Sequence, residues 1–116
     1  MKKLFLLVFA LLLINPIVIS QWQSYNVSSS GRFYDVCVVS PDLIWASGDS
    51  AKVYRSTNGG LNWQSLGNGL PNYTVLQITA IDQNRAWLNL GMKIFATTNG
   101  GTSWSEQFYS PITFIN

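Results

Sequence analysis

"RSTNGGLNWQS", residues 55–65, places three small polar residues and two glycines just before a tryptophan. A glycine-rich loop of this kind can cradle a phosphate when a helix follows, because the helix N-terminus then faces the anion. Here the following residues are Trp-Gln-Ser-Leu, which favour a strand. The segment therefore predicts a structural hairpin turn rather than a ligand-binding loop.

The segment has a second copy 41 residues downstream. "VYRSTNGGLNWQS" (53–65) aligns without a gap with "IFATTNGGTSWSE" (94–106), and "QWQSYN" (21–26) matches "NWQSLG" (62–67) at the same offset. Upstream, "DVCVVSPDLIWAS" (35–47) matches "QITAIDQNRAWLN" (77–89) at an offset of 42, so one residue is gained or lost between Gly48 and Ala51. The chain is therefore built from an internal repeat.

Each repeat predicts four short strands separated by turn signals. The strands are rich in Val, Ile, Tyr, Phe and Trp, as a buried pleated surface requires. They are expected at Phe33–Val39, Leu43–Ser47, Lys52–Ser56, Trp63–Leu66, Val75–Ile81, Ala86–Leu90, Lys93–Thr97 and Trp104–Phe108. Four strands in a unit of about 40 to 45 residues are typical of a β-propeller blade. The expected fold is all-β: an incomplete β-propeller of about two four-stranded antiparallel blades plus a lone N-terminal strand, preceded by a helical signal peptide.

The first twenty residues have the three parts of a secretory signal peptide. A positive start at Lys2 and Lys3 precedes an apolar run from Leu4 to Ile14, and short residues lead up to Ser20. Cleavage after Ser20 would make the chain secreted, periplasmic or attached to the cell surface, with no stable membrane insertion afterwards. The alternative is an N-terminal membrane anchor, although the apolar run is shorter than the roughly 20 residues of a spanning helix.

The remaining chain, 21–116, is expected to form a partial propeller. We expect a lone outer strand and linker at 21–32, one blade at 33–70, a second at 71–110 and the start of a next blade at 111–116. The smallest propellers have about four blades. Missing blades or self-association are therefore needed to cover the exposed faces.

"STNGGLNW" (56–63) and "TTNGGTSW" (97–104) resemble the Asp-box, or BNR repeat, whose pattern is Ser-x-Asp-x-Gly-x-Thr-Trp on a hairpin of a propeller blade. Both copies have Asn where that family most often has Asp. Sialidases, xyloglucan-type endoglucanases and sortilin-like receptors share the motif, and the blade pattern looks most like that of the photosystem II stability/assembly factor family. The resemblance covers nearly all of 21–116. It implies structural Asp-box roles for Ser56, Asn58, Gly60, Trp63, Thr97, Asn99, Gly101 and Trp104.

The physical chemistry of these residues predicts the same role. An Asn can bond downstream backbone N–H groups in an Asx-type turn, and glycines supply the positive φ of a tight hairpin. The hydroxyl groups of Ser56 and Thr97 can add a bond across the turn. Trp63 and Trp104 are expected to fold over the loop.

Composition excludes several classes of function. Once Lys2 and Lys3 are set aside, five basic and five acidic side chains balance, so no nucleic-acid-binding footprint remains. The chain has no His and only one Cys, so its sequence shows no metal-ligand spacing. It also predicts no cofactor site and no catalytic residue. Cys37 lies in an apolar strand and is interpreted as a structural thiol rather than a reactive one. The recurring tryptophans predict packing between blades rather than a sugar-binding platform.

These observations favour a secreted, non-enzymatic propeller module of a longer binding or assembly protein, with an unknown protein or glycan partner. One alternative is the N-terminal part of a propeller glycoside hydrolase, sialidase-like or xyloglucanase-like, whose catalytic residues lie elsewhere. "GRFYDV" (31–36) does not match the sialidase arginine motif, so no catalytic residue carries over. The other alternative is a short chain that completes a ring by oligomerising.

Overall fold

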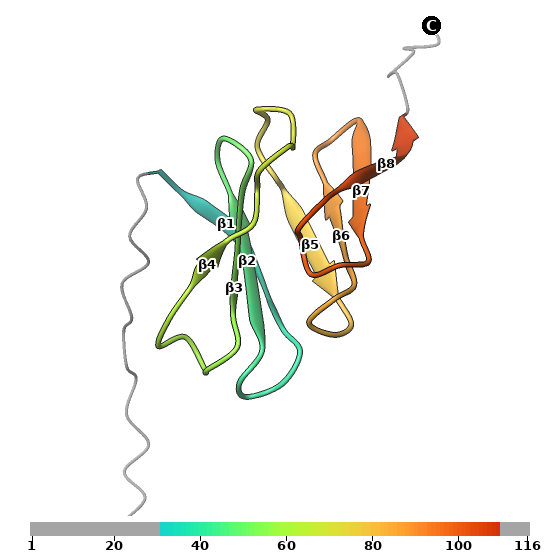
Figure 1. Ribbon diagram of the computed structural model, residues 1–116. Helices are drawn as coiled ribbons and strands as arrows, with labels where there is room; N and C mark the ends of the chain where they lie inside the picture. Colours follow the sequence, from blue (N-terminus) through green and yellow to red (C-terminus); the bar gives the residue numbers. More distant parts are fainter. Residues whose placement is uncertain (1–30, 110–116) are drawn as a thin grey trace, which may run out of the picture.

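The computed structural model describes residues 31–109 of the chain. Eight strands form two four-stranded antiparallel sheets that stand side by side (Figure 1). The expected signal peptide, residues 21–30 of the expected lone outer strand and linker (21–32), and the expected next blade at 111–116 lie outside the described residues. Within the described range no helix is long and apolar enough to cross a membrane.

Each sheet contains four strands in the order in which they follow along the chain. Blade 1 consists of β1 (Phe33–Val38), β2 (Ile44–Gly48), β3 (Lys52–Ser56) and β4 (Gln64–Ser65). Blade 2 consists of β5 (Gln77–Ala80), β6 (Ala86–Asn89), β7 (Lys93–Thr97) and β8 (Ser105–Tyr109). All eight strands were predicted from the sequence, and β3 and β7 have the predicted bounds. The prediction for β5 was wrong at its start, because the Val75 amide donates to Gly48 O of blade 1 (2.9 Å) and Val75 thus lies outside the β5 ladder.

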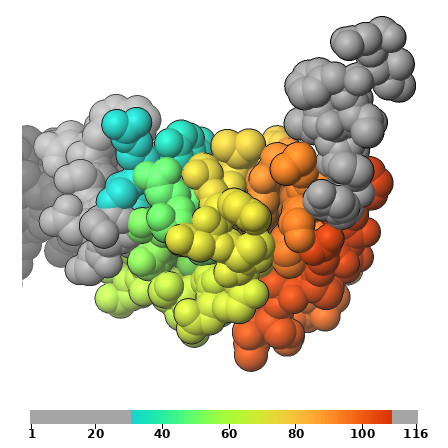
Figure 2. Space-filling view, turned by 90° about the horizontal axis from the view of Figure 1, so that it is seen from above, coloured from blue at the N-terminus to red at the C-terminus, as the bar shows by residue number. Residues whose placement is uncertain are grey.

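The core of the molecule lies between the two blades. The space-filling view shows the blades packed against each other (Figure 2). The front face of blade 1 is the side that faces blade 2, and its back face is the opposite side. The equivalent sides of blade 2 carry the same names, so the back face of blade 2 is the side that lies against blade 1. Trp45 and Val53 on the front face of blade 1 are fully buried. They meet the back face of blade 2, where Ile78, Leu88 and Phe95 are also buried. Burying apolar surface between sheets is the main stabilising term for such a pair.

Two side chains of β1 bind the backbone of β5 directly. Asp35 Oδ2 accepts a hydrogen bond from the Ile78 amide at 2.9 Å. Two residues along, Cys37 Sγ accepts from the Ala80 amide at 3.4 Å and lies 3.6 Å from Ala80 O. Cys37 is half-buried, and its thiol contributes to the contact between the two blades.

The β2–β3 hairpin contains one residue more than the β6–β7 hairpin. This extra residue changes the repeat offset from 42 before the hairpin to 41 after it. Ser50 and Ala51 both have positive φ, 53° and 57°, whereas the shorter β6–β7 hairpin uses Gly91 at φ 91°. A left-handed conformation costs an L-residue about 1–2 kcal/mol. The Ala51 amide donates to Tyr73 O at 2.8 Å, which helps to hold the strained turn in place.

We therefore expect Ala51→Gly to raise the free energy of unfolding by about 0.5–1 kcal/mol, since glycine removes the steric cost of positive φ but loses more chain entropy on folding. Urea denaturation followed by circular dichroism measures the change. A lower midpoint for the variant would contradict the strained turn.

Candidate functional site

The first Asn-Gly-Gly turn joins β3 to β4 through bonds made by two side chains. Ser56 Oγ is buried and accepts hydrogen bonds from the amides of Gly60 (2.8 Å) and Asn58 (3.3 Å). Asn58 Oδ1 accepts from the Asn62 amide at 2.9 Å and also contacts Ser56 Oγ at 3.0 Å. Gly59 and Gly60 have φ of 70° and 94°, a conformation that favours glycine.

The second turn joins β7 to β8 and repeats this bonding. Thr97 Oγ1 accepts from the Gly101 amide at 2.9 Å, and Asn99 Oδ1 accepts from the Ser103 amide at 3.0 Å. Gly100 and Gly101 have φ of 71° and 85°. The two turns share one backbone geometry despite the Ser-to-Thr change.

The two motif tryptophans behave differently. Trp63 Nε1 donates to Gly60 O at 2.9 Å, over its own turn as expected. Trp104 Nε1 instead donates to Leu66 O of blade 1 at 2.7 Å, and its ring stands edge-on to Trp45 with centroids 6.4 Å apart. Trp104 therefore bonds to blade 1, which lies beside this turn, and not to its own loop as Trp63 does.

Arg55 of β3 fastens blade 1 to the turns of blade 2. Its Nη1 donates to Gln83 O at 2.6 Å and to Gly100 O at 3.0 Å. Its guanidinium lies 5.3 Å from the centre of the Trp45 ring, a cation–π distance. Partial burial lowers the pKa of Arg55 from its ordinary value, yet a guanidinium stays protonated in proteins.

We expect Arg55→Met to lower the free energy of unfolding by about 2 kcal/mol, because two charge-assisted bonds are lost and two carbonyls are left unpaired. Arg85→Met is the control. Arg85 binds Asp82 of its own turn at 2.8 Å on the surface and should cost less than about 0.5 kcal/mol. Equal losses in urea denaturation would contradict the fastening role.

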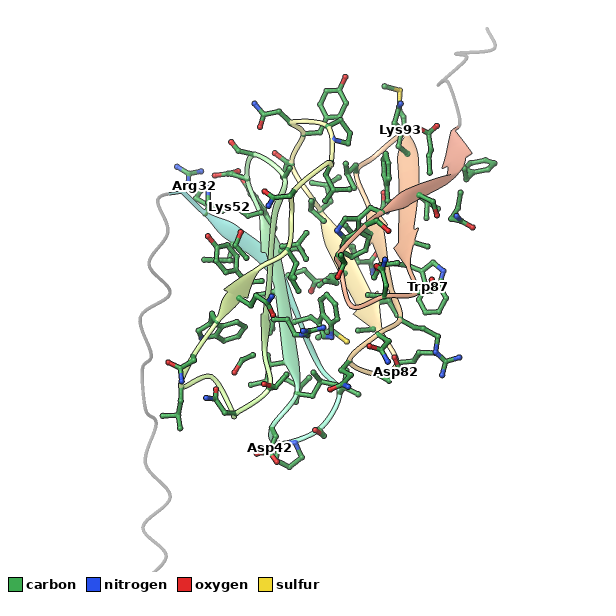
Figure 3. All side chains as sticks on the ribbon, in the orientation of Figure 1. Arg32, Asp42, Lys52, Asp82, Trp87 and Lys93 are labelled. Carbon is green, nitrogen blue, oxygen red and sulfur yellow. The ribbon has the colours of Figure 1, made fainter. Side chains whose placement is uncertain are left out.

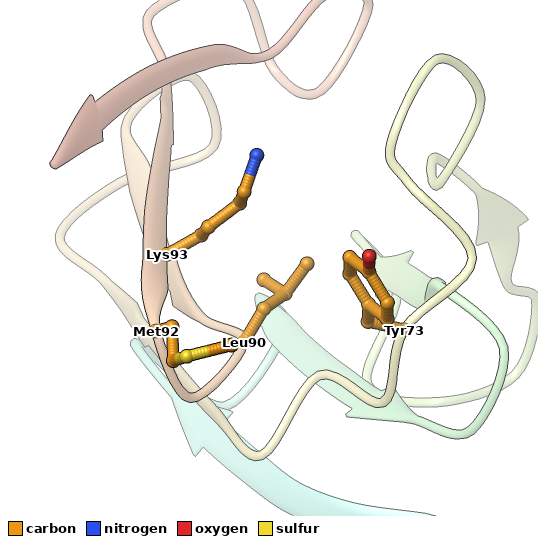
Figure 4. A pocket seen from close by; sticks show the side chains of 4 residues that line it. All are labelled: Tyr73, Leu90, Met92 and Lys93. Carbon is orange, nitrogen blue, oxygen red and sulfur yellow. The ribbon is translucent and has the colours of Figure 1, made fainter. Parts of the chain in front are cut away.

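A hollow of about 320 Å³ opens at the end of the molecule where the β6–β7 hairpin meets the segment that links the blades (Figure 4). It is lined by Tyr73, Leu90, Met92 and Lys93. Tyr73 and Met92 are exposed, and Lys93 pairs with Glu106 at 3.1 Å. The hollow thus combines an aromatic ring, flexible apolar chains and an ammonium group, whereas the sequence had singled out none of these residues.

The front face of blade 2 is also hollowed, with a volume of about 190 Å³. It includes Gln77, Thr79, Trp87, Asn89 and Ile94. Trp87 is 39% exposed and lies on the side of blade 2 away from blade 1 (Figure 3). Trp87 repeats Trp45, but no described blade covers it, so the prediction that the recurring tryptophans pack between blades stays a prediction at Trp87.

No three His, Cys, Asp or Glu residues in 31–109 group as metal ligands would. Hydrogen bonds from the Arg85 side chain, then from the Asn84 and Arg85 amides, hold the pKa of Asp82 below its usual range. Asp82 therefore stays ionised and stabilises its own turn.

Comparison with known proteins identifies the architecture. No protein-family model and no curated protein matches the sequence. Among solved structures, the chain is similar to YCF48 bound to a D1 peptide, with a TM-score of 0.67 and 19% sequence identity. The match covers 82% of this chain and 31% of the YCF48 chain, so the chain spans about a third of that structure. The similarity shows the fold alone: the two sheets are those of an incomplete β-propeller.

Proposed function

We propose that this chain is a secreted, non-enzymatic Asp-box propeller module that binds a segment of another protein. The hollow at the blade ends carries the proposal. Apolar side chains with a few well-placed polar groups are the usual lining of binding sites, and about 320 Å³ suits one or two side chains of a polypeptide. YCF48, which shares the fold, has been solved with a peptide bound.

The Asp-box assignment is supported by the paired turns. In each, the first hydroxyl residue accepts from the second glycine and the Asn binds the amide four residues on. These hydrogen bonds stabilise the turns themselves. We therefore place the binding of a partner on the surfaces around the turns. A longer propeller, of which these blades form one part, would place further loops around the hollow.

Secretion predicts a defined N-terminus. Exported chain should begin at Gln21, because Ser20 ends the small-residue site that follows the apolar run. N-terminal sequencing of the protein released by an expressing cell tests this. Chain that keeps Met1 and stays with the membrane would support the anchor instead.

Selection of short random peptides displayed on phage against the full chain tests the binding function. Recovered peptides are measured by fluorescence anisotropy. We expect Tyr73→Ser and Met92→Ser to weaken them about tenfold or more, as loss of a binding anchor does. Leu61→Ser is the matched control, since Leu61 is 62% exposed on the turn at the opposite end of the blade. Failure to recover a peptide, or equal loss in the control, would contradict the proposal.

A further inference from the structure

The back face of blade 1 repeats the surface that blade 2 buries. Ile78 and Ala80 of β5 are 3% and 8% exposed because they lie against blade 1. Their equivalents in β1 are Val36 and Val38, which are 58% and 64% exposed. The same docking surface is therefore present twice in the molecule and covered once within the described residues.

The turn beside this open face repeats the arginine acceptor of blade 2. There, Arg55 Nη1 is held by the carbonyls of Gln83 and Gly100. The equivalent carbonyls of blade 1 are those of Pro41 and Gly59, by the repeat offsets of 42 and 41.

The two turns that carry these carbonyls have similar backbone geometry. Gly59 and Gly100 have φ of 70° and 71°, and each amide donates at 2.9 Å to the turn before it. Pro41 O lies 3.3 Å from the position a Cβ on Gly59 would take, and Gln83 O lies 3.1 Å from that on Gly100. The blade 1 pair is thus shaped for a guanidinium, and no side chain in residues 31–109 donates to it.

The front face of blade 2 in a second copy lacks the group that would fill this site. Blade 2 has Ala96 where blade 1 has Arg55. Ala96 pairs in register with Trp87, as Arg55 pairs with Trp45. A copy that docked its blade 2 front face here would present a tryptophan without the arginine.

We propose that the carbonyls of Pro41 and Gly59 form an arginine-binding site, and that its occupant is a β-sheet face that presents an arginine stacked on an aromatic ring. The occupant covers Val36 and Val38 as blade 1 covers Ile78 and Ala80. The site lies apart from the hollow at Tyr73, so the proposal stands independently of the peptide-binding function.

The chain itself can be made into the missing partner. Ala96→Arg places an arginine beside Trp87, which lets the front face of blade 2 in one molecule dock on the back face of blade 1 in another. We expect sedimentation equilibrium of the full chain to show head-to-tail association about tenfold or more stronger for this variant than for the wild type, as charge-assisted bonds would give. Ala96→Met, of similar length without the guanidinium, should leave association unchanged.

A block on the acceptor side completes the test. A Cβ on Gly100 would lie 2.6 Å from Arg55 Nη1, so a Cβ on Gly59 would stand where the incoming guanidinium binds. Adding Gly59→Ala to the Ala96→Arg variant should abolish the gain. Association of the wild type as strong as that of Ala96→Arg would overturn the proposal and make a second copy the occupant.

The unmodified chain gives a separate measurement. On titration with N-acetyl-arginine amide, the Gly59 and Gly60 amide resonances should shift, whereas those of Gly100 and Gly101, whose site Arg55 already fills, should not. N-acetyl-lysine amide is the control ligand. Equal shifts at both turns, or none at Gly59, would overturn the proposal even if the Ala96→Arg variant failed to fold.

Discussion

Trp45→Ala should lower the free energy of unfolding by about 3–5 kcal/mol, the usual cost of truncating a buried aromatic side chain. The Trp45 side chain is fully buried between the blades. Its truncation opens a cavity, removes the edge-on contact with Trp104 and deprives the Arg55 guanidinium of the ring it lies against. Urea denaturation followed by far-ultraviolet circular dichroism measures the loss without depending on tryptophan fluorescence.

Trp87→Ala is the matched control for that substitution. Trp87 occupies the same register position in blade 2, opposite Ala96 as Trp45 is opposite Arg55, but it is 39% exposed. Because it fills no described interface, its truncation should cost less than about 1 kcal/mol. Equal losses at the two positions would contradict the description of one covered and one open front face.

Gly101→Ala should destabilise the chain by about 2–4 kcal/mol. Gly101 has φ of 85°, which strains an alanine, and its added Cβ would lie 2.9 Å from Leu66 Cβ across the joint between the blades. The backbone of the turn is bonded to Thr97 Oγ1 and cannot easily move aside. Thermal and urea denaturation of the variant give the loss.

Gly69→Ala separates the two causes. Gly69 also has φ of 85°, but nothing lies within 4 Å of its added Cβ. It should therefore cost only the backbone strain, about 1 kcal/mol. If both variants lost the same stability, the contact between Leu66 and the turn would contribute nothing, against the packing described here.

Local sequence predicted the strands and turns well, because their causes are local. β3 and β7 have the predicted bounds, since glycine-bearing turns and apolar alternation define both ends. β5 starts later than predicted because Val75 finds its hydrogen-bond partner in blade 1, at Gly48. Such a long-range bond leaves no mark in the sequence near Val75.

The surfaces were harder to predict than the strands. Recurrence of tryptophan predicted packing between blades but not which copy the described blades would cover: Trp45 is buried, whereas Trp87 is 39% exposed. The sequence shows that Ala96 replaces Arg55 in the second copy, but it assigns no role to Arg55. The significance of that difference depends on the carbonyl pair of Gln83 and Gly100, which only the folded arrangement brings together.

Amide hydrogen exchange tests the central claim, that one blade-to-blade joint is made and its repeat on blade 1 is open. The Ile78 and Ala80 amides are bonded to Asp35 Oδ2 and Cys37 Sγ across the joint. In the full chain, measured by NMR, they should exchange about tenfold or more slowly than the equivalent amides of Val36 and Val38. Equal exchange in the two pairs would contradict the account: equally fast exchange would mean that the blades do not dock, and equally slow exchange that the back face of blade 1 is already covered.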